Sequence, residues 1–166
     1  KSGSDISGGI SNSGTISGMG IKGGYGIQVS AANISGGITN NSGGAISGPT
    51  YGIDIKSPTA IISIINDGEI SGDSGGITSY NGTLNLSGSG THGAITGNSN
   101  SDLNIVSDTS SSDAITGFEN VLVKDAATFN LGHNLAATTV TVGEGTSGTL
   151  AVGTSAATVT GNLTMA

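Results

Sequence analysis

The chain repeats a five-residue phrase, Gly-x-Ile-Ser/Thr-Gly, which reads Gly44-Ala-Ile-Ser-Gly48 in one of its copies. Three other copies are intact, and a fifth, Asp113 to Gly117, lacks only the first glycine. The central isoleucines are 30, 24, 25 and 20 residues apart, a period typical of a stacked repeat and not of a globular core. We therefore expect these isoleucines to occupy corresponding buried positions: Ile16, Ile46, Ile70, Ile95 and Ile115.

A second series consists of apolar-x-apolar triplets that lie between copies of the phrase. Each triplet is a minimal strand, because alternate side chains of a strand point to opposite faces. Successive triplets are 22, 19, 18 and 19 residues apart, and one further step of 19 reaches Val159. Two backward steps of 28 reach Ile34 and Ile6. The first residues of the triplets are expected in the core stack as well: Ile62, Leu84, Leu103, Val121 and Val140.

A third series begins with Tyr-Gly-Ile at Tyr25 and at Tyr51, and Gly76-Ile77 is a weaker third member. Three short strands per repeat, separated by Gly/Ser/Asn corners, are typical of one coil of a parallel β-helix. One coil buries too few isoleucines to offset the ordering of about twenty residues, so stability has to come from stacking. The sequence predicts an all-β fold, a right-handed parallel β-helix (β-solenoid) with three short strands per coil and roughly seven coils.

The repeat runs through the whole chain without a linker, so residues 1–166 are predicted to form a single β-helix domain. Residues 1–83 contain long coils with corner insertions, whereas residues 84–166 contain shorter, regular coils. The sequence does not open with a signal peptide, and the repeat runs up to both ends, which suggests a fragment of a longer protein. Since long corners can vary without breaking the core, we expect the contact surface within residues 19–83.

Composition narrows the range of partners. Only 9% of the residues are charged, the net charge is −7, and the chain contains four lysines and no arginine. Nucleic-acid binding requires clustered cations, so no nucleic-acid partner is expected. The longest apolar run, Ala60 to Ile65, is interrupted by Ser63 and is too short to cross a bilayer, so this segment is not expected to be membrane-inserted itself. The absence of cysteine is compatible with passage through an oxidising periplasm.

Two short motifs resemble catalytic or cofactor sites, but their place in the repeat explains them better. Gly72-Asp-Ser-Gly-Gly76 matches the nucleophile phrase of trypsin-like proteases, yet both histidines lie downstream, which reverses the order in those enzymes. Gly18 to Gly23 matches a dinucleotide fingerprint, but the glycines that follow it prevent the helix that such a site needs. We predict no catalytic residue and no bound cofactor, and we interpret both stretches as corners.

Metal binding is also not expected. His92 and His133 are 41 residues apart, about two coils, and are interpreted as loop histidines. Asp67, Glu69 and Asp73 fall within seven residues and could suggest calcium. The sequence does not contain the Gly-Gly-x-Gly-x-Asp motif of calcium-binding solenoids, so a solvated acidic corner is the preferred interpretation.

Tyr25, Tyr51 and Tyr80 are the candidate contact residues. If Tyr25 and Tyr51 recur at one corner, they would form an aromatic ladder, and aromatic side chains are favoured in the recognition of proteins and sugars. The alternative interpretation is that the tyrosines cover the edge of their own core, because the Gly-Ile that follows makes them part of the repeat.

Three further stretches form a pattern together: Ile38 to Gly48, Ile115 to Val123 with the following Phe129-Asn-Leu-Gly132, and Val159 to Met165. In their order along the chain they resemble the passenger domains of bacterial autotransporters, the self-exporting proteins of Gram-negative bacteria. The resemblance implies a right-handed parallel β-helix that is exported through the periplasm and outer membrane and is secreted or held at the bacterial cell surface. It supplies no catalytic residues, so the chain is not expected to be an enzyme.

The resemblance also implies the partners: a host-cell surface protein or glycan, or the passenger of a sister cell. The main expectation is a non-catalytic passenger segment acting in adhesion or host-cell receptor binding. One alternative is a soluble host-receptor ligand that acts as a virulence effector. Another is a structural filament, because the uncapped ends of a β-helix are exposed strand edges that would allow a monomer to associate end to end.

Overall fold

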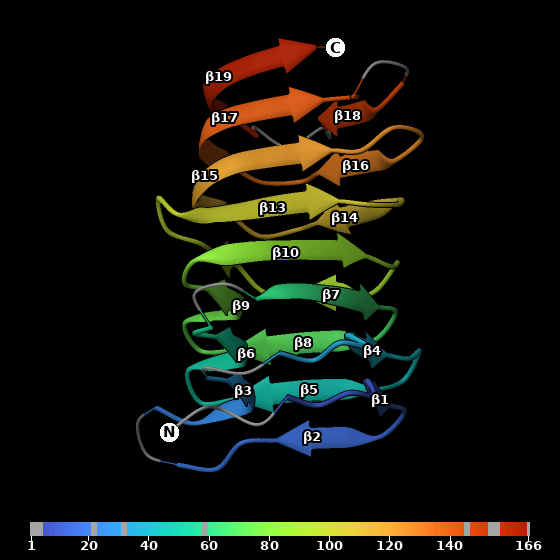
Figure 1. Cartoon of the computed structure of the whole chain (residues 1–166), viewed down its shortest axis with the longest axis vertical. Coiled ribbons are helices and arrows are strands. Elements are labelled where there is room, and N and C mark those ends of the chain that lie inside the picture. The colour runs from blue at the N-terminus through green and yellow to red at the C-terminus, as the bar shows by residue number, and fades with distance from the viewer. Residues whose placement is uncertain are drawn as a thin grey trace.

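The computed structural model describes residues 5–20, 23–30, 33–57, 60–144, 147–152 and 157–165. Within these ranges the chain is all-β, and its strands pair in parallel as a right-handed solenoid with three strands per coil (Figure 1). This confirms the predicted parallel β-helix. The solenoid makes about six turns, against the roughly seven coils expected from the repeat. None of the described segments is a helix of the length and apolarity needed to cross a bilayer.

Two faces of the solenoid belong to one sheet. The first face stacks β1 (Ile10–Asn12), β4 (Ile38–Asn40), β7 (Ile61–Asn66), β10 (Gly82–Ser87) and β13 (Ser101–Ile105). The second face stacks β3 (Tyr25–Val29), β6 (Tyr51–Ile55), β9 (Gly75–Ser79) and β12 (Ile95–Thr96). Both faces join on longer strands that turn the corner between them: β15 (Ile115–Val123), β17 (Leu135–Val142) and β19 (Val159–Met165).

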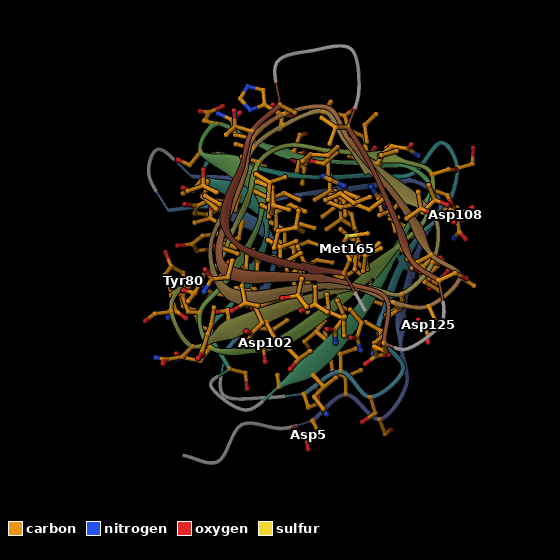
Figure 2. All side chains as sticks on the ribbon, turned by 90° about the horizontal axis from the view of Figure 1, so that it is seen from above. Asp5, Tyr80, Asp102, Asp108, Asp125 and Met165 are labelled. Carbon is orange, nitrogen blue, oxygen red and sulfur yellow. The ribbon has the colours of Figure 1, made fainter. Side chains whose placement is uncertain are left out.

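The third face is divided into two sheets. The first contains β2 (Thr15–Ser17), β5 (Ala45–Gly48), β8 (Glu69–Gly72) and β11 (Thr91–His92). The second contains β14 (Thr109–Ser111), β16 (Thr128–Leu131) and β18 (Thr149–Val152). The ladder on this face is therefore interrupted between β11 and β14. Seen from above, the coils enclose a roughly triangular section that is filled by side chains (Figure 2).

The register of the strands stacks most of the predicted core residues on one another on neighbouring coils. Ile46 lies between Ile16 and Ile70 on neighbouring coils, as the phrase predicts. The triplet residues also follow one another in register and are buried: Ile62, Leu84, Leu103, Val121 and Val140. Ile16 is only partly buried, because β2 pairs with β5 on one side alone among the described strands.

The phrase does not mark one stack along the whole chain, and this part of the prediction is wrong. His92, and not Ile95, follows Ile70 in register. Ile95 lies on the second face, between Ile77 and Ile115, although both Ile95 and Ile115 are fully buried. The reason is that Gly-x-Ile occurs on both the second and the third face, so the local sequence does not determine which face a copy of the phrase occupies.

The prediction that Val159 is the counterpart of Val140 on the next coil is likewise wrong. Val140 is followed in register by Leu163, whereas Val159 pairs with Leu135. The step of 19 residues fails because β17 and β19 run continuously through a corner, and their register shifts between Ala136 and Thr139.

An asparagine ladder runs inside one corner of the first three coils. The Nδ2 of Asn12 donates to the Oδ1 of Asn40 at 2.9 Å, and the Nδ2 of Asn40 donates to the Oδ1 of Asn66, also at 2.9 Å. The Nδ2 of Asn66 then donates to the carbonyl oxygen of Thr91 at 2.8 Å. Because all three asparagines are buried, each side-chain hydrogen bond replaces one that water would otherwise make.

Replacing Asn40 by alanine is expected to lower the free energy of unfolding by about 1–3 kcal/mol, because it removes the central rung and orphans buried groups on both neighbours. Urea unfolding followed by far-UV circular dichroism measures this loss. Asn130→Ala, on the exposed face of β16, is the matched control and should change stability by less than about 0.5 kcal/mol. Equal losses in the two variants would show that the ladder contributes nothing specific.

Candidate functional site

The tyrosine ladder stands on the second face of the solenoid. Tyr25 of β3 and Tyr51 of β6 are register partners, and their rings are stacked with centroids 6.5 Å apart and planes 4° from parallel. The third position of the ladder is Gly75 of β9. A Cβ atom on Gly75 would come within 3.3 Å of Cε1 of Tyr51, so the Tyr51 ring lies against this glycine.

A carboxylate and an ammonium group lie beside the rings. The Nζ of Lys56 is 3.1 Å from the Oδ2 of Asp54, 3.4 Å from the hydroxyl of Tyr25 and 5.0 Å from the Tyr25 ring centroid. The Nε2 of Gln28 donates to the same Oδ2 at 2.8 Å. Lys56 therefore neutralises Asp54 and makes a cation–π contact with Tyr25.

Asp54 is fully buried although it lies on an outer strand face, and one of its oxygens is unused. Its Oδ1 has no hydrogen-bond partner within the described part of the chain, and the same holds for Oγ1 of Thr78. These two residues are register partners on β6 and β9. Buried polar atoms are normally hydrogen-bonded, so a pair of unpartnered oxygens on neighbouring coils is unusual.

The protonation states of the patch follow from its surroundings. Burial raises the pKa of Tyr51, and the charges of Tyr80, Asp54 and Tyr25 raise it further. The hydrogen bond to Asp54, and then the one to Tyr25, raise the pKa of Lys56. Both raised pKa values keep Tyr51 a neutral phenol and Lys56 an ammonium group at neutral pH.

Tyr80 completes the group. It directly follows β9, its backbone N–H donates to the carbonyl oxygen of Ile55 at 2.8 Å, and 39% of its surface is exposed. Figure 2 shows Tyr80 on the outside of the coil, directed away from the interior. We use the name tyrosine patch for Tyr25, Tyr51, Tyr80, Asp54 and Lys56. All of its members lie within the predicted 19–83 segment.

An open groove lies next to the tyrosines, at the corner between the third and second faces. It has a volume of about 410 Å³ and is lined by serines and glycines of three successive coils, with Pro49 and Asp73. Ser17, Ser47 and Ser71 are register partners. A Cβ atom on Gly48 would lie 2.7 Å from the Cα of Tyr25, so only glycine permits this close approach between corner and ladder.

The protease-like stretch is a corner, as predicted. Ser74 is exposed in the turn between β8 and β9, and its N–H donates to the carbonyl oxygen of Thr50, one coil earlier, at 2.9 Å. The fingerprint-like stretch from Gly18 to Gly23 is interrupted at Ile21 and Lys22, which lie outside the described residues.

His92 is not a loop histidine, so this prediction is wrong. It belongs to β11, follows Ile70 in the core and is only 3% exposed. Within the described ranges neither ring nitrogen has a hydrogen-bond partner, and burial lowers the pKa of His92. His133 is exposed, and its Nδ1 accepts from the N–H of Asn134 at 2.8 Å.

The acidic corner carries no cluster of metal ligands in the part of the chain that the structure describes, where no three histidine or carboxylate side chains gather. The Oδ1 of Asp67 accepts hydrogen bonds from the backbone N–H and the hydroxyl of Ser89, while Glu69 and Asp73 are exposed.

No known protein family, curated protein or solved structure matches this chain. The likeness to autotransporter passengers therefore depends on the sequence stretches quoted above. The described residues define a parallel β-solenoid with an aromatic and polar patch on one face, and the function is inferred from that patch.

Proposed function

We propose that this chain is a non-catalytic passenger segment of a bacterial autotransporter, displayed on the cell surface or released, and that it binds the surface of a host cell or sister cell. The observation that carries this proposal is the tyrosine patch. It combines two stacked rings, an exposed third tyrosine and a paired lysine and aspartate on one face of a rigid solenoid.

The chemistry of the patch suits recognition. Tyrosine buries a large apolar area at low entropic cost and still offers a hydroxyl group, which is why it is enriched at the centre of binding surfaces. The strands that carry Tyr25 and Tyr51 are fixed by parallel pairing on neighbouring coils, so little ordering remains to be done when a ligand binds.

Binding of the fluorescently labelled soluble chain to intact host or sister cells tests the proposal. The wild-type chain is expected to bind saturably, and Tyr51→Ala is expected to weaken binding by at least about tenfold. Ile61→Ala removes a 62% exposed apolar side chain from a different face and is the matched control, which should bind like wild type. Saturable binding that survives Tyr51→Ala would place the contact elsewhere, and the absence of binding to either cell type would reject the function.

The soluble-receptor-ligand alternative uses the same patch but differs in valency. Beads coated with the chain should hold cells together if the chain is an adhesin, because many weak contacts add up. A soluble effector should instead bind one receptor at its full affinity as a monomer. The filament alternative stays a prediction that concentration-dependent sedimentation tests.

A further inference from the structure

We propose that the ligand of the tyrosine patch is a neutral glycan, with one pyranose ring stacked on Tyr51 beside Gly75 and the adjoining sugars lying along the serine-lined groove. This inference rests on the proposed binding function and specifies its partner. It is carried by the incomplete aromatic ladder, by the polar groups around it and by the distribution of charge.

The ladder is one ring short. Tyr25 and Tyr51 occupy two successive coils, and the next register position is Gly75, which has no side chain. The Tyr51 ring lies against Gly75, and no aromatic ring follows it at that register position. Aromatic faces carry negative charge, and the C–H groups on one face of a pyranose are weakly positive, so a sugar ring can take the place of the missing rung.

The groups around this position can form hydrogen bonds with sugar hydroxyls, which both donate and accept. The phenol groups of Tyr51 and Tyr80 do both as well, and the exposed Gln28 amide and partly exposed Lys56 ammonium add donors. In the adjoining groove of about 410 Å³, serine hydroxyls recur on three coils in register. A chain of linked sugars that runs along the solenoid axis would meet one such hydroxyl per coil.

Charge favours a neutral glycan over an anionic one. Lys56, the cation that the structure places beside the tyrosines, is already paired with Asp54 at 3.1 Å. Asp73 lines the groove, and the whole chain has a net charge of −7. A carboxylated or sulfated sugar would approach this surface against repulsion and would have to break the Lys56–Asp54 pair to gain a partner.

The chain provides its own reporter for this site. It contains no tryptophan, and its three tyrosines are those of the patch, so tyrosine fluorescence reports on the patch alone. We would titrate the soluble chain with neutral oligosaccharides released from mammalian cell-surface glycoproteins, and with sialylated and sulfated oligosaccharides as the anionic set. Saturable fluorescence changes are expected with neutral sugars, and binding of the anionic set is expected to be at least about tenfold weaker.

Two variants separate stacking from hydroxyl contacts. Tyr51→Phe keeps the ring and is expected to retain binding within about threefold, whereas Tyr51→Ala removes the platform and should abolish it. Equal or tighter binding of anionic sugars, or unchanged binding by Tyr51→Ala, would overturn the proposal. Circular dichroism of each variant verifies that the solenoid is intact.

Enzymatic removal of glycans from the target cells distinguishes failure of this inference from failure of the proposed function. If wild-type binding to cells is lost after the treatment, the glycan assignment is supported. If saturable binding persists unchanged and still requires Tyr51, the partner is a protein, and the glycan inference falls while the binding function stands. If untreated cells are never bound, both fall.

Discussion

Replacing His92 by isoleucine is expected to abolish much of the loss of stability that the wild-type chain shows as the pH falls from about 8 to about 5. The imidazole follows Ile70 in the core, where an isoleucine would continue the stack of Ile16, Ile46 and Ile70. Neither ring nitrogen has a hydrogen-bond partner of good geometry among the residues that the structure describes, and burial disfavours the charged ring.

The sign of the pH effect follows from the lowered pKa of His92, which is caused first by burial. A histidine in the unfolded chain has a pKa of about 6.5, so below that pH the unfolded chain binds a proton that the folded chain excludes. The stability is therefore present above the unfolded pKa and is lost as the pH falls, by at most about 1.4 kcal/mol per pH unit. The backbone of Gly93, and after it the charge of Asp113, favour the proton and oppose the effect of burial. Glu69 of the neighbouring β8 lies opposite Thr91 and is exposed.

Urea unfolding at several pH values measures this effect as the difference between wild type and His92→Ile, which cancels the titration of the carboxylates. His133→Ala, at the exposed histidine, is the matched control and should keep the wild-type pH dependence. If His92→Ile and wild type lose stability in parallel on acidification, the ring is not buried and neutral as described. The interruption of the third face between β11 and β14 makes this the place where acid is expected to open the solenoid first.

Ile70→Ala is expected to destabilise the protein by about 2–5 kcal/mol, because it leaves a cavity in a stack that is closed on both sides. Ile70 is fully buried and lies between Ile46 and His92 in register. In a repeat protein each coil contacts only its neighbours, so the loss should be concentrated in the adjoining coils. Urea unfolding gives the total, and amide hydrogen exchange gives its distribution.

Ile61→Ala is the matched control for this experiment, because Ile61 is the same residue type on the preceding strand of the same coil and is 62% exposed on β7. It should change stability by less than about 0.5 kcal/mol. A similar loss in both variants would mean that the inward and outward faces of the third coil are wrongly assigned.

The core could be predicted wherever a strand left a regular signature in the sequence. The triplets from Ile62 to Val140 alternate with period two and recur at nearly constant spacing, and they stack as expected. Ile95 could not be placed in the same way, because Gly-x-Ile serves the third face at Ile70 and the second face at Ile77. Only pairing between coils, a long-range property, decides between the two.

The site could be predicted in part. The repeated Tyr-Gly-Ile offered an aromatic ladder of Tyr25 and Tyr51 as one of two interpretations, and the structure stacks the two rings. Sequence reasoning did not predict that Asp54, Lys56 and Thr78 belong to the site. Two opposite charges two residues apart, such as Asp54 and Lys56, ordinarily lie on a solvated strand face. The available signal was the offset that Asp54 shares with Gln28, three residues after each tyrosine, which places the two side chains on neighbouring coils.

Recognition of cell surfaces by the tyrosine patch can be measured by ¹⁹F NMR of the chain labelled with fluorotyrosine. The chain has three tyrosines, so three resonances are expected, one each for Tyr25, Tyr51 and Tyr80. On addition of membrane vesicles prepared from cells that bind the chain, the resonances of Tyr51 and Tyr80 should shift or broaden most. If the chain sediments with the vesicles while all three resonances are unchanged, the patch is not the contact surface and this solenoid binds cells by another face.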